Sequence, residues 1–196
     1  MTDTTPHDAV RAAVLTVSDR SAAGERPDDA GPVAVAALRA SGFACDDALV
    51  VADGADSVAA GLRRLLAGGA RLVVTSGGTG IAPRDQTPEG TMRVIDRTLP
   101  GIAEELRRQS AAVAPGALLS RGVAGVSGTA LIVNLPGSPK AVAEGMPLVL
   151  SLARHALDQL TGGDHCPVQV SSRPAQVSSR PAQVFSRPVP PFRPCP

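Results

Sequence analysis

Continuous apolar runs of strand length, rather than alternating ones, are the feature that most restricts how this chain folds. Between them, apolar residues recur at the spacing of a helix. Strands that are apolar on both faces and alternate with helices are typical of a mostly parallel sheet covered by helices on both sides, so the predicted fold class is α/β. The expected strands cover residues 11–17, 48–51, 72–74 and 129–133, the expected helices cover 32–40, 58–66, 91–97, 102–110 and 140–160, and 118–126 is expected to be extended or a hairpin.

Several residues mark where the predicted helices begin. Thr87 and Ser138 are each followed by proline, which is typical of a helix N-cap with proline at the first helical position. Asp56 is expected to be the N-cap of the helix that follows it, because aspartate is a common N-cap residue. Pro147 lies inside the last predicted helix, where it should kink or split that helix because it lacks a backbone N–H group.

The 196 residues suit one α/β domain with a tail. Residues 1–9 form a polar, flexible lead-in, and residues 10–163 form the domain. In the tail, 164–196, the heptad Val170–Gln176 is repeated as Val177–Gln183, and a proline in each unit excludes a coiled coil. A segment rich in proline, serine and arginine cannot bury enough apolar surface to fold, so the tail is expected to be disordered. A passive tail is favoured over proline-rich recognition of a partner.

Composition excludes several classes of function. With 19 basic and 18 acidic residues, the overall charge does not indicate a nucleic-acid partner. Phe43 is the only aromatic residue before the tail, so a ring-shaped ligand must be held by backbone and small polar groups. Cys45, Cys166 and Cys195 show neither a disulfide framework nor the spacing of a metal site. The sequence shows no signal peptide and no apolar run of membrane-spanning length, which predicts a cytoplasmic protein without a membrane partner.

A glycine-rich loop, Thr75–Pro88, follows the third apolar run. Gly77, Gly78 and Gly80 allow positive φ angles and a close approach of the backbone to a ligand. Asp85 stands at the far end of the loop. A polar glycine loop between a strand and a helix suits an anion such as phosphate. A simple chain reversal would explain two of the glycines, but not the length of the loop or its acid.

A second polar loop, Asn134–Lys140, follows the last apolar run. Lys140 is the only lysine in the chain and falls in the first turn of a predicted helix. The helix dipole disfavours a cation at that position unless an anion binds beside it. Ligands of parallel sheets bind at the carboxyl ends of the strands. Because both loops leave such ends, we expect them to face one another across one cleft.

The remaining inventory of side chains restricts the chemistry. Pro83 stands where a Gly-x-Gly-x-x-Gly fingerprint needs its last glycine, and a Walker lysine is missing. Carboxylates, hydroxyls and glycine loops suit phosphate binding with magnesium, and therefore phosphoryl or nucleotidyl transfer. Asp53 and Asp85 could supply the carboxylates. Alternatively, Asp85 only orients its loop by pairing with Arg84, and Asp53 is a turn acid.

The order of several motifs resembles the MoaB/Mog family of molybdenum cofactor biosynthesis proteins, to which the G domain of gephyrin also belongs. The resemblance covers roughly Val10 to Leu160 and is specific because the motifs occur together in the family's order. The motifs are Thr75–Gly80, Arg84–Glu89, Pro100–Glu104, Leu119–Arg121 and Asn134–Lys140.

The resemblance implies a three-layer molybdopterin-binding fold that assembles as a homotrimer or homohexamer. It also implies Mg²⁺-dependent adenylyl transfer, in which the terminal phosphate of molybdopterin attacks the α-phosphorus of ATP and pyrophosphate leaves. The adenylylated product would pass to the molybdate-inserting protein. Asp53 and Asp85 match the family's essential acids, so they are the expected catalytic residues and Mg²⁺ ligands. The expected substrate-binding residues are Thr75, Ser76, Gly77, Gly78, Thr79, Gly80, Glu104, Pro136, Gly137, Ser138 and Lys140.

Two residues depart from the family's pattern. Ala52 precedes Asp53 where the family often has proline, and Gln86 replaces a common valine. The alternative interpretation is a paralogue that binds molybdopterin without catalysis, or an oligomeric carrier. Retention of both acids favours the enzyme, because binding of anionic phosphates alone gains little from additional carboxylates.

Overall fold

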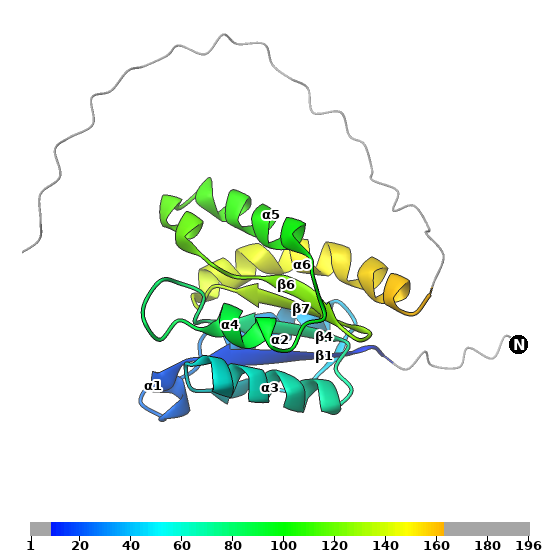
Figure 1. Cartoon of the computed structure of the whole chain (residues 1–196), viewed down its shortest axis with the longest axis horizontal. Helices are drawn as coiled ribbons and strands as arrows, with labels where there is room; N and C mark the ends of the chain where they lie inside the picture. Colours follow the sequence, from blue (N-terminus) through cyan, green and yellow to red (C-terminus); the bar gives the residue numbers. More distant parts are fainter. Residues whose placement is uncertain (1–8, 163–196) are drawn as a thin grey trace, which may run out of the picture. The chain divides into compact units, whose positions relative to one another are not determined.

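A computed structural model describes residues 9–162 of the chain (Figure 1). The expectations for residues 1–8 and 163–196, including the disordered tail, lie outside these residues. The described elements are β1 (Arg11–Val17), α1 (Asp19–Ala22), α2 (Gly31–Ala40), β2 (Ala44–Cys45), β3 (Leu49–Val51), α3 (Ala55–Ala67), β4 (Leu72–Ser76), α4 (Thr87–Met92), β5 (Arg97–Thr98), α5 (Pro100–Ala111), the 3₁₀ helix η1 (Pro115–Leu119), β6 (Ala124–Ser127), β7 (Ala130–Leu135) and α6 (Pro139–Leu160).

A seven-stranded sheet forms the centre of the domain. Its strand order is β2-β1-β4-β7-β6-β5, with β3 also paired to β1. The strands β2, β3 and β4 run parallel to β1, and β7 runs parallel to β4. Only the β6 and β5 pairings are antiparallel among the described strands. The prediction of an α/β fold with a mostly parallel sheet is therefore confirmed.

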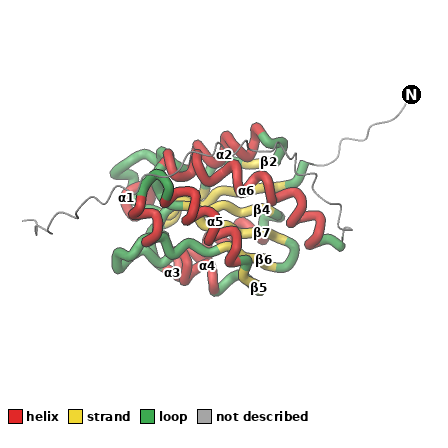
Figure 2. The backbone as a smooth tube through the Cα atoms, turned by 90° about the horizontal axis from the view of Figure 1, so that it is seen from above, coloured by secondary structure: helices red, strands yellow, loops and turns green. Residues whose placement is uncertain are grey.

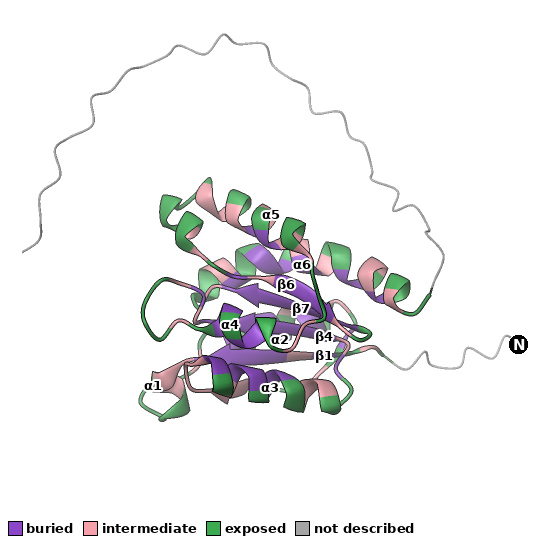
Figure 3. Cartoon of the chain, in the orientation of Figure 1, coloured by how far each residue is buried: buried purple, intermediate pink, exposed green. Residues whose placement is uncertain are grey.

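Helices cover both faces of this sheet, because the central strands are apolar on both sides. On one face, α2, α5 and α6 pack against Val14, Val74 and Val133. Side chains alternate between faces along a strand, so Val73 and Ile132 point the other way and pack with residues of α3. Figure 2 shows α2, α6 and α5 lying over the strands, and Figure 3 shows the central strands as the buried layer. The result is the three-layer arrangement.

Most predicted elements are present, but the predicted helix at residues 91–97 is wrong. The helix in this region, α4, covers Thr87–Met92, and Arg97–Thr98 form the edge strand β5 instead. Between them the chain turns because the Asp96 amide donates a hydrogen bond of 2.7 Å to the Val126 carbonyl. Pairing with β6 therefore prevails over a weak local helical pattern. The expected extended stretch at 118–126 is present only in part, as β6 after the end of η1.

Two of the three predicted N-caps are wrong. Gln86, not Thr87, precedes α4, and Gly54, not Asp56, precedes α3. Ser138 is the N-cap of α6, as predicted, and its hydroxyl accepts a hydrogen bond of 3.1 Å from the Ala141 amide. The Thr87 side chain does not cap the helix and instead donates a hydrogen bond to the Gly77 carbonyl in the glycine loop.

The final helix, α6, is a single element in spite of its proline. It runs from Pro139 to Leu160 with Pro147 inside it, so the predicted split is wrong. Val142, Met146, Val149 and Ala153 are buried at helical spacing on the face toward the sheet. Burial of such an apolar stripe stabilises a helix by more than the roughly 3 kcal/mol that an interior proline removes.

In the described part of the chain, none of the helices combines the length and the apolar character needed to cross a membrane.

Candidate functional site

Parallel strands bring four loops to the same edge of the sheet. In the register of the sheet, Thr16 of β1 lies beside Ser76 of β4, and Ser76 lies beside Leu135 of β7. At the other side of β1, Val17 lies beside Val51 of β3. The segments that follow these four strands therefore leave together. They carry Asp19, Asp53, the glycine loop and the Pro136–Lys140 loop.

The glycine loop packs directly against the second loop rather than across a wide cleft. The Gly77 amide donates a hydrogen bond of 3.2 Å to the Leu135 carbonyl, and the Ser76 hydroxyl donates one of 3.2 Å to the Pro136 carbonyl. A Cβ atom on Gly137 would lie 3.1 Å from the Gly77 Cα atom. Residues of both loops line the same cavities, as expected, but the loops also touch directly because β4 and β7 are neighbours in the sheet.

The glycine loop turns at two successive residues that have positive φ angles. Gly77 has φ 104° and Gly78 has φ 61°, a combination that side-chain-bearing residues rarely adopt. A Cβ atom on Gly77 would come closer than 3.0 Å to the Val17 carbonyl oxygen. Glycine is therefore required at this position both for the backbone conformation and for space.

The loop offers backbone N–H donors to an anion, although the first glycine amide is already used. The Gly77 amide bonds to Leu135, so it is not available to a phosphate. The amides of Gly78, Thr79 and Gly80 have no hydrogen-bond partner among residues 9–162. Three adjacent unpaired N–H groups beside the N-terminus of α6 are a typical site for phosphate oxygens.

A buried polar network supports the loop from below. The Asn134 side-chain amide donates hydrogen bonds of 3.0 Å to the hydroxyls of both Thr75 and Thr91. Next to it, the Thr87 hydroxyl donates a hydrogen bond of 2.8 Å to the Gly77 carbonyl. Thr75 is fully buried and lines no cavity, so the structure gives it a supporting position instead of the expected substrate contact.

Both predicted acids lie against glycines of the loop. Asp53 Oδ1 would be 3.2 Å from a Cβ atom placed on Gly78, and Asp85 Oδ2 would be 2.7 Å from one placed on Gly80. The absence of side chains at these glycines therefore gives the carboxylates access to the same surface as the unpaired amides. Asp85 Oδ2 also accepts a hydrogen bond of 2.9 Å from the Ala82 amide, which orients its loop, whereas the alternative pairing of Asp85 with Arg84 is absent.

Two cavities open at this edge and share a wall. The first, of about 550 Å³, contains both predicted acids and the charged residues Asp19, Arg20 and Arg26. The second, of about 630 Å³, extends over η1 and the start of α6. Both cavities are lined by Gly78, Asp85, Gly137 and Ser138. A ligand with two parts could therefore occupy both cavities while its phosphates contact the shared wall.

The structure brings most, but not all, predicted binding residues to this wall. Ser76 and Gly77 line the first cavity. Glu104 does not join them, because it lies on the exposed face of α5 and lines neither cavity. The second cavity is lined by the predicted residues Thr79, Gly80, Pro136 and Lys140.

The donor set fits magnesium held jointly by protein and substrate. Among residues 9–162, no three Asp, Glu, His or Cys side chains gather as a complete metal site. Asp53 and Asp85 nevertheless line one cavity beside free backbone donors. Magnesium is commonly bound by one or two carboxylates together with substrate phosphates and water. Two acids beside unpaired backbone amides meet that requirement.

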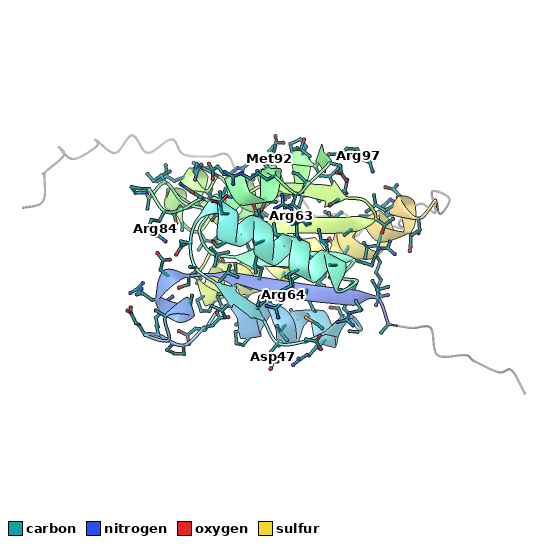
Figure 4. All side chains as sticks on the ribbon, turned by 60° about the horizontal axis from the view of Figure 1, so that its bottom comes forward. Asp47, Arg63, Arg64, Arg84, Met92 and Arg97 are labelled. Atoms are coloured by element: carbon teal, nitrogen blue, oxygen red, sulfur yellow. The ribbon has the colours of Figure 1, made fainter. Side chains whose placement is uncertain are left out.

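An ion pair that the sequence reasoning did not identify fixes the Asp53 side of the site. Asp19 and Asp53 exchange hydrogen bonds, from each backbone amide to the other's carboxylate, at 2.8 and 3.0 Å. The Arg84 guanidinium donates two hydrogen bonds, of 2.5 and 2.9 Å, to the Asp19 carboxylate and a third, of 3.2 Å, to the Asp53 carbonyl. Figure 4 shows Arg84 at one end of the molecule, far from Arg97. The sequence feature that could have indicated Asp19 is its position in Ser18-Asp19-Arg20, which follows β1 directly.

The hydrogen bonds from Arg84 lower the pKa of the Asp19 carboxyl below its ordinary value. A lowered pKa means that this pairing is fully present above the ordinary Asp range and is lost only as the pH falls through the pKa of the folded state. We expect Arg84→Gln to raise the Asp19 pKa back toward the ordinary value, as measured by carboxyl ¹³C NMR titration. Arg20→Gln, in the same cavity, is the control, and equal Asp19 titration curves in wild type and Arg84→Gln would refute the assignment.

Comparisons with known proteins agree with this fold. The family model described as a probable molybdopterin binding domain matches residues 13–155. This match places the α/β domain in a class of probable molybdopterin binding domains. The chain belongs to this family, and the predicted resemblance is confirmed.

Named relatives support the same assignment. The Mog protein of molybdopterin biosynthesis from Mycobacterium ulcerans is 42% identical, with a TM-score of 0.74 over 79% of this chain and 98% of that one. A molybdenum cofactor biosynthesis bifunctional protein of Chlorobaculum tepidum is 34% identical over 79% of this chain and 50% of its own length. A molybdopterin adenylyltransferase of Escherichia coli is 51% identical over 37% of each chain. The chain spans about half the length of the first curated relatives it matches.

Proposed function

We propose that this domain acts in molybdenum cofactor biosynthesis by transferring the adenylyl group of ATP to the terminal phosphate of molybdopterin. The observation that carries the proposal is the shared wall, where Asp85 lines both cavities beside the unpaired amides of the glycine loop. Relatives named molybdopterin adenylyltransferase support this reaction. A carrier that only bound the pterin would gain little from carboxylates beside an anionic phosphate.

The two cavities suggest how the substrates are arranged. The first cavity holds Asp53 and Asp85, so it suits the ATP phosphates and their magnesium ion. The second cavity has more apolar lining and contains Lys140, whose charge suits the phosphate of the pterin substrate. The shared wall then brings the pterin phosphate next to the α-phosphate of ATP. Such positioning of two reactants is a large part of the catalysis of phosphoryl-type transfer.

In the proposed reaction, an oxygen of the pterin's terminal phosphate forms a bond to the α-phosphorus of ATP. The bond from the α-phosphorus to the bridging oxygen breaks, and its electron pair leaves with pyrophosphate. The nucleophile is already ionised, so no Ser, Cys or His of the protein is needed as a base. The amides of Gly78, Thr79 and Gly80 would stabilise charge on the phosphate oxygens. Magnesium, when held by Asp53 and Asp85, would supply electrostatic stabilisation of the leaving pyrophosphate.

Assembly and hand-over belong to the proposal as well. We infer a homotrimer or homohexamer from the family resemblance, with the adenylylated pterin passed to a molybdate-inserting protein. Size-exclusion chromatography with light scattering would measure the assembly without reference to activity.

Purified protein incubated with molybdopterin and Mg-ATP should release pyrophosphate in proportion to the molybdopterin added. Chelation of magnesium should stop the release. Tight molybdopterin binding without pyrophosphate would instead identify the domain as a binding-only paralogue.

A further inference from the structure

Arg121 connects both ends of the glycine loop's exposed half. Its backbone amide donates a hydrogen bond of 2.8 Å to the Thr79 carbonyl. Its Nε group donates another, also 2.8 Å, to the Gly80 carbonyl, and its Nη2 group donates to the Asp85 carbonyl. The guanidinium therefore joins the residue that begins the segment 80–85 to the acid that ends it.

Glu89 supports this guanidinium from the first turn of α4. Its Oε1 atom accepts a hydrogen bond from Arg121 Nη1, and its Oε2 atom lies 3.4 Å from Nη2. This bond lowers the pKa of the Glu89 carboxyl below its ordinary value. A planar guanidinium can meet a carboxylate and two carbonyls at once, whereas a lysine ammonium cannot reproduce that fork.

The segment between these anchors has few other attachments. Ile81 at its tip is 68% exposed. Apart from those with Arg121, its hydrogen bonds are the Ala82–Asp85 turn, those from Arg84 to Asp19 and to the Asp53 carbonyl, and one from the Gln86 side chain to the Pro83 carbonyl. Arg121 thus joins both ends of this segment to the part of the chain that precedes β6. Since it lines neither cavity itself, it acts on Asp85 through the backbone.

We propose that Arg121 and Glu89 are positioning residues that hold Asp85 at the shared wall in the geometry needed for catalysis. The proposal rests on the proposed adenylyl transfer. The side chains of Arg121 and Glu89 are 40% and 45% exposed. An exposed ion pair contributes little to stability on its own. The contacts to three loop carbonyls therefore point to a role in loop geometry rather than in holding the fold together.

Arg121→Lys should lower kcat by about ten- to a hundredfold, since a misplacement of about 1 Å at a catalytic group has effects of that size. The KM for molybdopterin should change little, and the magnesium concentration for half-maximal rate should rise, because Asp85 is a proposed ligand. Arg108→Lys is the matched control, because it alters an exposed Arg–Glu pair on α5 that does not contact the loop. Its kcat should stay at the wild-type value.

A double variant tests whether Glu89 acts through Arg121. Glu89→Gln alone should lower kcat less than Arg121→Lys, because the amide still accepts one hydrogen bond. Adding Glu89→Gln to Arg121→Lys should produce little further loss, which is the non-additivity expected of residues in one network. If the double variant lost kcat by the product of the two single losses, Glu89 would not act through Arg121.

Hydrogen exchange of the folded protein separates this proposal from the proposed function. Arg121→Lys should speed exchange of the Ala82 and Asp85 amides, which donate the hydrogen bonds of the loop turn, but not of amides in α6, whatever reaction the domain catalyses. If wild type releases no pyrophosphate while exchange still rises, the proposed function fails and the loop-positioning part stands. Unchanged exchange with unchanged kcat would overturn the positioning role. So would a loss of kcat fully explained by a lower folded fraction.

Discussion

Asp85→Asn should reduce adenylyl transfer by about a hundred- to a thousandfold while the protein stays folded and binds molybdopterin. The asparagine oxygen can still accept the hydrogen bond from the Ala82 amide, so the loop turn is kept. The variant loses the negative charge that we assign to magnesium binding at the wall shared by the two cavities. Loss of one preorganised electrostatic group in an active site commonly costs two to three powers of ten in rate. Steady-state pyrophosphate release and molybdopterin titration would measure both parts.

Asp56→Asn is the matched control for this substitution. Asp56 is also an acid near this edge of the sheet, but its side chain is 99% exposed and pairs with Arg93. It lines neither cavity, so its variant should retain near-normal turnover. Near-normal turnover in Asp85→Asn would show that the assigned mechanism is wrong.

Gly77→Ala should cause the largest loss of stability among substitutions in the loop. A residue with a side chain at φ 104° is strained by about 1–3 kcal/mol. In addition, the new Cβ atom would meet the backbone carbonyl of Val17, so β1 and β4 would have to move apart. We expect the free energy of unfolding to fall by more than the strain alone, as measured by urea denaturation, together with loss of pterin binding.

The control is Gly24→Ala, which isolates backbone strain from steric conflict. Gly24 has φ 74°, yet a Cβ atom there would meet no atom within 4 Å. Its variant should lose only the strain component and should keep molybdopterin binding. Equal destabilisation by the two substitutions would mean that the predicted clash with Val17 is relieved without cost.

Much of this domain could be predicted from local sequence because its central strands are unambiguous. β1 is continuous and apolar, and it begins and ends as expected at Arg11 and Val17. The loop glycines, Asp53 and Asp85 also stood out as residue types, and strand polarity alone placed their loops at the carboxyl edge. Ser138 likewise caps α6 through its own side chain. Such features depend on short-range chemistry that a sequence displays directly.

Other features depend on which strands are neighbours, and local sequence does not encode that order. Asn134 contacts Thr75 because β4 and β7 are adjacent, and it contacts Thr91 because α4 packs against β7. For the same reason, nothing local showed that Thr75 would be buried under the loop while Ser76 lines a cavity. Residues 96–98 pair their backbone with β6 rather than within a helix. Arg121 reaches the loop across 41 residues of sequence, as its contact with Gly80 shows.

The fate of the α-phosphate of ATP tests the central claim most directly. Purified protein would be incubated with magnesium, molybdopterin and ATP labelled with ³²P at the α-phosphate, with Asp85→Asn in parallel. We predict that the label moves onto the pterin, with one pyrophosphate released for each label transferred, and that Asp85→Asn transfers almost none. Label that stays in ATP while wild-type protein demonstrably binds molybdopterin would contradict the assignment of this site to adenylyl transfer.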